Sequence, residues 1–527
     1  MTQPAFDATA PWQALAAAIG ADQVLRDDAS RAFYTQDVYS RGRPADAVLR
    51  PGSTAELREA VRLCTAAGLA VVPRGGGMSY TGGYVADAAG VVIIDLGRMD
   101  RVLAIDPVDM TVTVEAGCTW ATLHEALARE GLRTPFWGTL SGLRATVGGG
   151  LSQNAIFWGS GQFGGAADSV LSLEVVLADG SLLRTGSAAR EQTPPFFRHF
   201  GPDLTGLFTG DTGALGFKAT ATLRLLPALP ARDYLAFDFP GADGTLAAMS
   251  ELSRHNLPME CFAFDPRLQR QRMKRQGLSE DVKALAGVMK GAGSLARAVR
   301  DGARVARAGR GYMSDVAFSV QVVVEDRSDA AVAERIALAR TLCERCGGRE
   351  IENSIPRITR GRPFGPLNSM LGPEGERWLP VHGVFPHSRA TEAYAATEAL
   401  FERERERNDA LGVSTGYLFA TVSTHAVVIE PVLFWPDELY PLHEASVESK
   451  HLARLPRHAA NPAAREQVAA LRDAIVDCYA ALGATHFQIG RTYRYRDTLR
   501  PEALSLIRAL KSAVDPRGLV NPGSLGL

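Results

Sequence analysis

Cysteine is sparse in this chain, and neither sign of charge dominates. Six cysteines in 527 residues are too few for a disulfide framework, which favours a reducing compartment. The pair Cys343 and Cys346 lacks the second pair that a zinc site needs, so we expect no metal. The formal net charge of −1 predicts no nucleic-acid partner. No apolar run approaches the roughly 18 residues of a membrane span, and no secretory leader is evident. We therefore expect a cytoplasmic protein.

The strongest feature is a loop at residues 74–83, RGGGMSYTGG, which has five glycines in ten residues. It follows an apolar run, residues 70–73, that predicts a short buried strand. The loop has neither the G-x-G-x-x-G spacing nor the G-K-[S/T] ending of common nucleotide-binding loops. Glycines after a strand let the backbone approach a ligand, and a row of free N–H groups suits a pyrophosphate. A plain glycine-rich surface turn is the alternative.

Two more glycine-rich loops follow at residues 145–154, ATVGGGLSQN, and 207–216, LFTGDTGALG. In sequence and spacing, the three loops resemble the FAD-binding domain of the vanillyl-alcohol oxidase and p-cresol methylhydroxylase superfamily, over about residues 45–228. The resemblance implies that the first loop holds the FAD pyrophosphate, the second runs beside the flavin, and the third closes on the cofactor. The cofactor-binding residues that it implies are Pro73, Arg74, Gly75, Gly76, Gly77, Met78, Ser79, Thr139, Ser141, Thr146, Gly148, Gly149, Asn154, Gly210, Gly213, Gly216, Phe217 and Arg491.

The same resemblance, with the pattern of elements, predicts an α+β fold in three parts. These are a two-subdomain FAD-binding domain at 1–228 (core 45–228), a cap or substrate domain at 229–460, and a return to the FAD domain at 461–527. The cap is expected to be an antiparallel sheet covered by helices. We expect strands at 235–239, 316–324 and 426–430 and helices at 11–19, 53–67, 330–346, 390–410 and 463–482.

A basic segment at residues 267–310 interrupts the cap, with twelve Lys or Arg against three acids. A basic amphipathic helix there would suit an anionic membrane surface or an acidic partner. A solvated helix or loop is the alternative.

Residues 485–496, THFQIGRTYRYR, are the richest stretch in candidate catalytic side chains. If the stretch is extended, Arg491, Tyr493 and Tyr495 share one face. Arginine can bind a carboxylate or phenolate in bidentate fashion, although an exposed basic strand fits equally well. In vanillyl-alcohol oxidase a tyrosine–arginine–threonine triplet here binds the phenolate; Gly490-Arg491-Thr492 matches all but the tyrosine. His486 is all that remains of a histidine-rich segment found in related synthases and dehydrogenases.

Three further candidates lie elsewhere. His425 is similar in place to the histidine that carries the covalent flavin link in vanillyl-alcohol oxidase, or else is a hydrogen-bonded strand residue. A covalent link through the first loop is excluded, because Met78 stands where the berberine-bridge branch has the histidine that forms it. Glu430 is a lone carboxylate in an apolar strand, so it is either a base with a raised pKa or a surface residue. Tyr80 in the first loop could contact the substrate.

We predict an FAD-dependent oxidoreductase that moves a hydride from an alcohol or benzylic carbon to flavin N5, then passes electrons to oxygen or another acceptor. The first expected substrate is a para-substituted phenol or aryl alcohol. A D-2-hydroxy acid, as in D-lactate or glycolate dehydrogenases, comes second because their H-x-x-D-G-N-x-H metal motif is absent. A non-redox flavoenzyme like alkylglycerone-phosphate synthase and an FAD-free binding protein are further alternatives. We expect a homo-oligomer.

Overall fold

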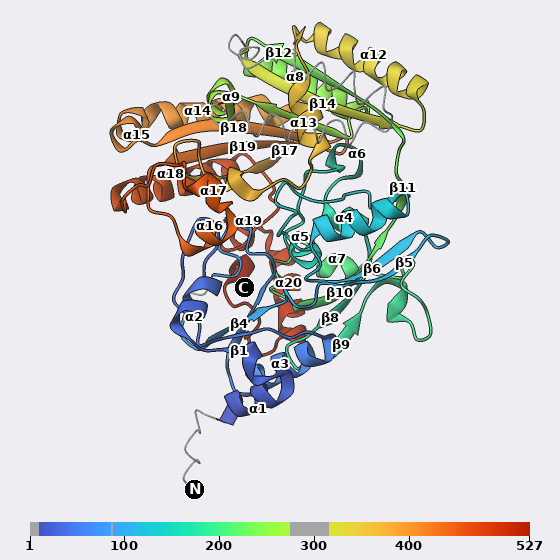
Figure 1. The fold of residues 1–527 in the computed structure, drawn as a ribbon, viewed down its shortest axis with the longest axis vertical. Helices are drawn as coiled ribbons and strands as arrows, with labels where there is room; N and C mark the ends of the chain where they lie inside the picture. Colours follow the sequence, from blue (N-terminus) through green and yellow to red (C-terminus); the bar gives the residue numbers. More distant parts are fainter. Residues whose placement is uncertain (1–9, 86–87, 274–315) are drawn as a thin grey trace.

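The computed structural model describes residues 10–85, 88–273 and 316–527. Its strands form sheets of four, five, two and eight strands. The three smaller sheets make up the lower half of the molecule in Figure 1, and the eight-stranded sheet with its helices makes up the upper half, which we call the cap. This mixture of antiparallel sheets and helices confirms the predicted α+β class.

The four-stranded sheet has the order β1-β2-β4-β3, with β2, β3 and β4 parallel. Apolar side chains of β3 and β4 pack against α1 and α3. Helix α3 begins after Ser53, whose Oγ accepts the Glu56 N–H, while the Glu56 carboxylate accepts the Gly52 N–H. The bounds are α1 Ala10–Ile19, β1 Val24–Leu25, α2 Asp28–Tyr34, β2 Ala47–Leu49, α3 Thr54–Ala66, β3 Ala70–Arg74 and β4 Val91–Asp95.

The five-stranded sheet is antiparallel, with the order β5-β6-β10-β8-β9. β8 and β9 form a hairpin at Asp179 and Gly180, where Gly180 takes a φ of +79°. The bounds are β5 Val102–Asp106, β6 Thr111–Glu115, α4 Trp120–Arg129, β7 Leu132–Arg133, α5 Val147–Ser152, α6 Ser160–Phe163, β8 Val170–Val176, β9 Leu182–Arg184, α7 Leu204–Leu207, β10 Phe217–Arg224 and β11 Leu226–Pro227; β7 pairs with β11.

The cap sheet has the order β15-β12-β14-β13-β18-β19-β16, and β17 also pairs with β19. Helices α8, α12, α14 and α18 pack on one face. The other face carries a separate aromatic and aliphatic cluster that includes Phe487 of the C-terminal part. The strands are β12 Ala231–Phe239, β13 Glu260–Phe264, β14 Phe318–Asp326, β15 Arg349–Glu350, β16 Arg377–Pro380, β17 Gly383–Pro386, β18 Ser414–Val422 and β19 Ala426–Trp435.

The remaining helices of the described chain connect the cap strands or lead back to the lower half. They are α8 Ala242–Arg254, α9 Pro266–Met273, α12 Asp329–Arg345, α13 Ser354–Gly361, α14 Ala390–Arg403, α15 Arg405–Leu411, α16 Pro441–Ser446, α17 Ser449–Leu452, α18 Pro462–Ala481, α19 Tyr495–Thr498 and α20 Pro501–Val514. None of the described helices is long and apolar enough to cross a membrane.

Several predicted elements differ from the structure. The helix expected at 390–410 is two helices that meet at Glu404, and the strand expected to end at Glu430 continues through Pro431 to Trp435. Pro431 has no N–H for the ladder, but it lies between the stretches of β19 that pair with β17 and β16, residues 426–429 and 432–435, so it interrupts neither pairing. Of the basic segment, residues 274–310 lie outside the described residues. The division near residues 228 and 460 stays a prediction.

Candidate FAD site

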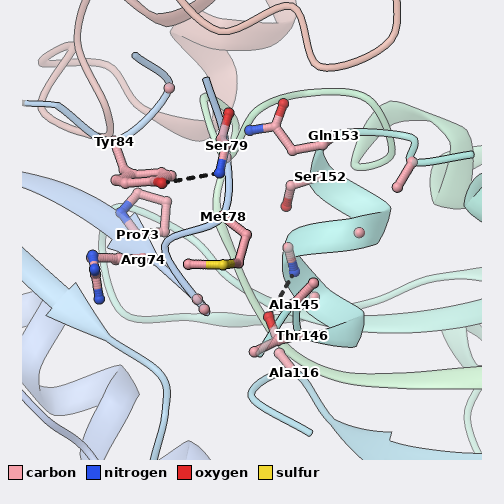
Figure 2. Close-up of a pocket in the computed structure, with 18 of the residues that line it drawn as sticks. Pro73, Arg74, Met78, Ser79, Tyr84, Ala116, Ala145, Thr146, Ser152 and Gln153 are labelled. Carbon is pink, nitrogen blue, oxygen red and sulfur yellow. Dashed lines mark hydrogen bonds between the residues drawn. The ribbon is translucent and has the colours of Figure 1, made fainter. Parts of the chain in front are cut away.

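A cavity that opens to solvent lies in the lower half of the molecule. The loop after β3 forms one wall and helix α5 the opposite wall, with the Met78 side chain between them (Figure 2). Residues 212–216 of the third glycine loop contribute as well. Fourteen of the predicted cofactor residues line this space: Pro73, Arg74, Gly75, Gly76, Gly77, Met78, Ser79, Thr139, Ser141, Thr146, Gly148, Gly149, Gly213 and Gly216.

The loops meet so closely that side chains would not fit between them. A Cβ on Gly76 would lie 1.9 Å from the Arg144 carbonyl oxygen, and one on Gly75 would lie 2.4 Å from Thr146 Oγ1. Gly213 has a φ of +70°, and a Cβ there would lie 2.5 Å from the Pro73 ring. Space therefore requires glycine at these contacts, and at Gly213 the backbone conformation requires it as well.

The cavity wall offers positive charge and free backbone donors. Arg74 is 4% exposed, and its guanidinium lies 4.7 Å from the Tyr34 ring centroid. Its Nη1 is 3.9 Å from Asp95 Oδ1, while its Nε and Nη2 have no hydrogen-bond partner in the described part of the chain. Within the same residues, the N–H groups of 75–78 donate to no protein acceptor. Such a wall suits an anion with several oxygens, as the FAD pyrophosphate is.

Polar contacts fix the shape of the walls. Tyr84 Oη accepts the Ser79 N–H at 3.2 Å, and Thr146 Oγ1 accepts the Gly149 N–H at 3.2 Å (Figure 2). Burial raises the pKa of Tyr84, so its hydroxyl stays protonated. Lys218 Nζ donates to Asp211 Oδ1 at 2.7 Å in a buried ion pair.

Sequence reasoning did not select twelve lining residues. They are Gly83, Tyr84, Leu96, Ala116, Ala145, Gly150, Ser152, Gln153, Ala155, Thr212, Lys218 and Gln488. A lysine seven residues after an aspartate, with no other charged residue between them or before Arg224, is a signal that could have indicated Lys218. Most of the others adjoin the three glycine loops, whereas Gln488 is distant in sequence and only tertiary structure brings it there.

Four predicted cofactor residues are not in the cavity wall, because each serves the protein itself. Asn154 Oδ1 accepts the Ala167 N–H at 3.1 Å, and the Gly210 N–H donates to Leu151 O at 2.9 Å. Phe217 is fully buried in the core beside α3. The fourth, Arg491, binds protein acceptors.

Arg491 ties the C-terminal part to the first loop. Its Nη1 donates to the Gly82 carbonyl at 2.5 Å, and its Nη2 donates to Asn521 Oδ1 at 2.8 Å and Pro522 O at 2.9 Å. The backbone N–H of Arg491 donates to the Thr81 carbonyl at 2.9 Å. This corrects the prediction that the guanidinium is presented to substrate: its donors are engaged with protein acceptors.

The stretch 485–496 is a series of turns followed by α19, not a strand, which removes the shared face expected for Arg491, Tyr493 and Tyr495. His486 and Tyr493 are instead packed together, with ring centroids 4.0 Å apart. Burial lowers the pKa of His486 to about 4, and His486 Nδ1 donates to a backbone carbonyl. Neither residue lines the cavity, so the structure gives them no direct access to the cofactor space.

The other catalytic candidates are on the cap or face it. His425 is exposed in the turn between β18 and β19 and does not line the cavity, which corrects its expected place in a strand over the flavin. Glu430 is half-buried in β19 opposite Leu418, on the face that carries the aromatic cluster. Tyr80 packs edge-on against Trp378, with centroids 5.6 Å apart.

Comparison with known proteins identifies the family. A model for the FAD binding domain matches residues 45–186, and a model for the C-terminal domain of FAD linked oxidases matches residues 230–525, more than half of the chain. The chain belongs to the FAD-linked oxidases. FAD is therefore the cofactor of this chain, and the prediction of an FAD-linked oxidoreductase with an FAD-binding domain and a C-terminal oxidase domain is confirmed.

The chain is similar to two curated relatives in sequence and to one solved structure in fold. The chain is 29% identical to a glycolate oxidase subunit of Bacillus subtilis over 43% of this chain and 46% of the relative. It is 31% identical to D-2-hydroxyglutarate dehydrogenase of Xanthomonas citri over 47% of this chain and 51% of the relative. The chain thus spans about half the length of these relatives. The structure of p-cresol methylhydroxylase shares the fold, with a TM-score of 0.71, 16% identity and coverage of 98% and 96%.

Proposed function

We propose that the protein is an FAD-dependent oxidoreductase that acts on a CH–OH group. Bound FAD would supply the hydride acceptor: the carbon would give up its hydride, the hydroxyl on that carbon would give its proton to a base, and a carbonyl would remain. The observation that carries the proposal is the glycine-lined cavity with free N–H groups at 75–78, in a chain of the FAD-linked oxidase family.

A 2-hydroxy acid is the first substrate class. Its support is that the curated relatives are named as a glycolate oxidase subunit and a D-2-hydroxyglutarate dehydrogenase. This reverses the order expected from the sequence motifs, which favoured a phenol. No group of three or more His, Cys, Asp or Glu that could hold a metal is present in the described residues.

An aryl alcohol is the second class, and the cap sheet favours it. The sheet face opposite the helices carries Phe262, Phe264 and Phe434, and Trp378 stacks on Phe434 at 6.1 Å. Tyr80 of the first FAD loop touches Trp378, so this aromatic face adjoins the cofactor loop. The three phenylalanines are buried in the core, whereas Tyr80 and Trp378 are half-buried. The rings of Tyr80 and Trp378 suit an aryl or alkyl group better than a second carboxylate. A 2-hydroxy acid with an aryl side chain satisfies both lines of support.

Glu430 is our candidate for the base, because it is a carboxylate on this same face of β19. We expect Glu430→Gln to slow flavin reduction by about a hundredfold, within the usual range for a lost general base, while FAD stays bound. Glu350→Gln, at the far edge strand β15, is the control and should reduce normally.

The test is the visible spectrum of the purified protein under argon, before and after adding matched pairs of substrates. Lactate and mandelate enantiomers, benzyl alcohol and 4-hydroxybenzyl alcohol separate carboxylate from aryl recognition. Bleaching by one class establishes the reaction and its substrate, and readmitted air separates oxidase from dehydrogenase. A yellow protein that no alcohol bleaches contradicts the proposal and favours a non-redox flavoenzyme.

A further inference from the structure

One peptide group at the cavity is held from both halves of the molecule. The Phe487 carbonyl accepts a hydrogen bond at 2.7 Å from His382, which lies between cap strands β16 and β17. The N–H of the same peptide, on Gln488, donates at 2.7 Å to the Gln153 carbonyl just after α5. Gln488 takes a φ of +49° and lines the cavity. The orientation of this peptide therefore sets the position of Gln488 in the cavity wall.

The hydrogen bonds of His382 define its protonation. The Phe487 carbonyl can only accept, so His382 Nε2 carries the hydrogen. His382 Nδ1 then accepts from the Tyr493 hydroxyl at 2.9 Å, and the His382 backbone N–H donates to the same Tyr493 oxygen at 2.8 Å. Burial, with the neighbouring His486, lowers the pKa of His382 well below its usual value. The ring is neutral, with one tautomer fixed by its partners.

The neighbours of His382 leave it no freedom to turn. Its ring stacks on Phe487 with centroids 3.8 Å apart and planes 11° from parallel. His486 Nδ1 donates to the His382 carbonyl at 2.9 Å, and the His486 ring stacks on Tyr493. Both ring nitrogens of His382 are thus occupied by protein groups, which excludes proton exchange with a substrate in this arrangement.

We infer that His382 is a positioning residue: its Nε2–H fixes the 487–488 peptide and so places the Gln488 side chain against bound FAD. The inference rests on FAD occupying the cavity and is independent of which alcohol is oxidised. Because the donor comes from the cap and the other anchor from the FAD loops, the cap and the cofactor site are coupled through this one peptide.

The test compares His382→Phe with His382→Gln as holoproteins without substrate. Phenylalanine keeps an aromatic ring against Phe487 but cannot donate, whereas glutamine can donate through its side-chain amide. We expect His382→Phe to change the visible circular dichroism of bound flavin and to weaken FAD binding by about tenfold, the usual effect of one hydrogen bond. His382→Gln should restore both toward the wild type. The exposed His425→Ala is the control and should match the wild type.

A double-mutant cycle tests whether His382 changes the flavin signal through Gln488. If His382 acts through Gln488, then Gln488→Ala alone reproduces the change in flavin dichroism, and the double variant adds little to it. Tyr493→Phe removes the hydrogen bond to His382 Nδ1 and should give a smaller change of the same kind, which keeps the test usable if His382→Phe does not fold. The inference would be overturned if His382→Phe had the flavin signal and FAD affinity of the wild type. If His382→Phe does not fold, an unchanged flavin signal in both Tyr493→Phe and Gln488→Ala would overturn it. So would equal damage in His382→Phe and His382→Gln. A wild-type protein that binds no FAD would contradict the proposed cofactor site instead.

Discussion

Two of the regions that bury arginine in this molecule satisfy it differently. At the boundary between cap and lower half, Arg360 donates to Glu325 at 2.6 and 3.1 Å, and Arg133 donates to the same carboxylate at 2.9 Å. In the cavity wall, Arg74 has only Asp95 at 3.9 Å, and two of its nitrogens have no partner among the described residues. The boundary completes its own ion pairs, whereas the cavity wall keeps positive charge for a ligand.

This difference separates a structural arginine from a ligand-binding one. A buried charge is costly unless it is paired, so an under-paired guanidinium beside a cavity indicates an anion supplied from outside. The Arg360 guanidinium lies 4.4 Å from the Trp137 ring and the Arg74 guanidinium 4.7 Å from the Tyr34 ring, so the ion pairs and not the aromatic contacts distinguish the two sites. Variants at the two sites should therefore change different quantities: stability at the boundary and cofactor affinity at the cavity.

The largest effect is expected at the boundary. Arg360→Met leaves Glu325 with only Arg133, and we expect a loss of about 3 kcal/mol in the free energy of unfolding. Arg340→Met removes an exposed ion pair with Glu350 and should cost less than about 1 kcal/mol. Chemical denaturation of both variants measures the difference. Equal losses would contradict the assignment of Arg360 to a buried structural network.

Gly76→Ala should come next and should act on the cofactor. The added Cβ would lie 1.9 Å from the Arg144 carbonyl, so the first and second loops must separate. Overpacking of this kind costs about 1–3 kcal/mol, up to about a hundredfold in FAD affinity. Gly241→Ala, where no atom lies within 4 Å, is the control. A yellow Gly76→Ala protein with normal FAD content would show that the loops need not meet this closely.

Arg74→Gln should weaken FAD binding by about tenfold and alter the unfolding temperature of the apoprotein little. The reason is the loss of one positive charge beside the anion. Arg50→Gln is the matched control, because Arg50 also pairs with Asp95, at 3.6 Å, but does not line the cavity. FAD titration of both apoproteins distinguishes them, and equal affinities would remove Arg74 from the cofactor site.

The smallest effect concerns Glu260 at the boundary. Burial raises the pKa of Glu260 to about 7, and Glu260 Oε1 accepts the Gly159 N–H at 2.9 Å. In the folded state the carboxyl keeps its proton above the pH at which it ionises when unfolded, so stability falls as pH rises from 5 to 7. The stability of Glu260→Gln should therefore fall less than that of the wild type over that interval.

Thermal unfolding at the two pH values tests this, with the exposed Glu125→Gln as control. An identical pH dependence in Glu260→Gln and the wild type would mean that Glu260 is ionised in the folded protein.

The FAD loops were predictable because each is continuous in sequence and glycine is required where the loops touch, as at Gly75 and Gly76. The catalytic candidates were not, because their places depend on tertiary contacts. The alternation of Arg491, Tyr493 and Tyr495 predicted one strand face, but turns with positive φ at Gln488 and Gly490 redirect the chain.

The cap illustrates the same limit. The apolar runs of β14 and β19 indicated strands, yet nothing in the sequence pairs His382 with the carbonyl of Phe487, more than a hundred residues away. Nor did the sequence indicate that Arg133 and Arg360 would share Glu325. Contacts of this kind arise from packing between distant segments and leave no local pattern.

The most direct test of the account is to strip the flavin and titrate the apoprotein with FAD and with riboflavin, in the wild type and in Arg74→Gln. We expect the wild type to bind FAD far more tightly than riboflavin, and we expect Arg74→Gln to lower the affinity for FAD but not for riboflavin. Equal affinity of the wild type for the two flavins would contradict a cavity built around the pyrophosphate.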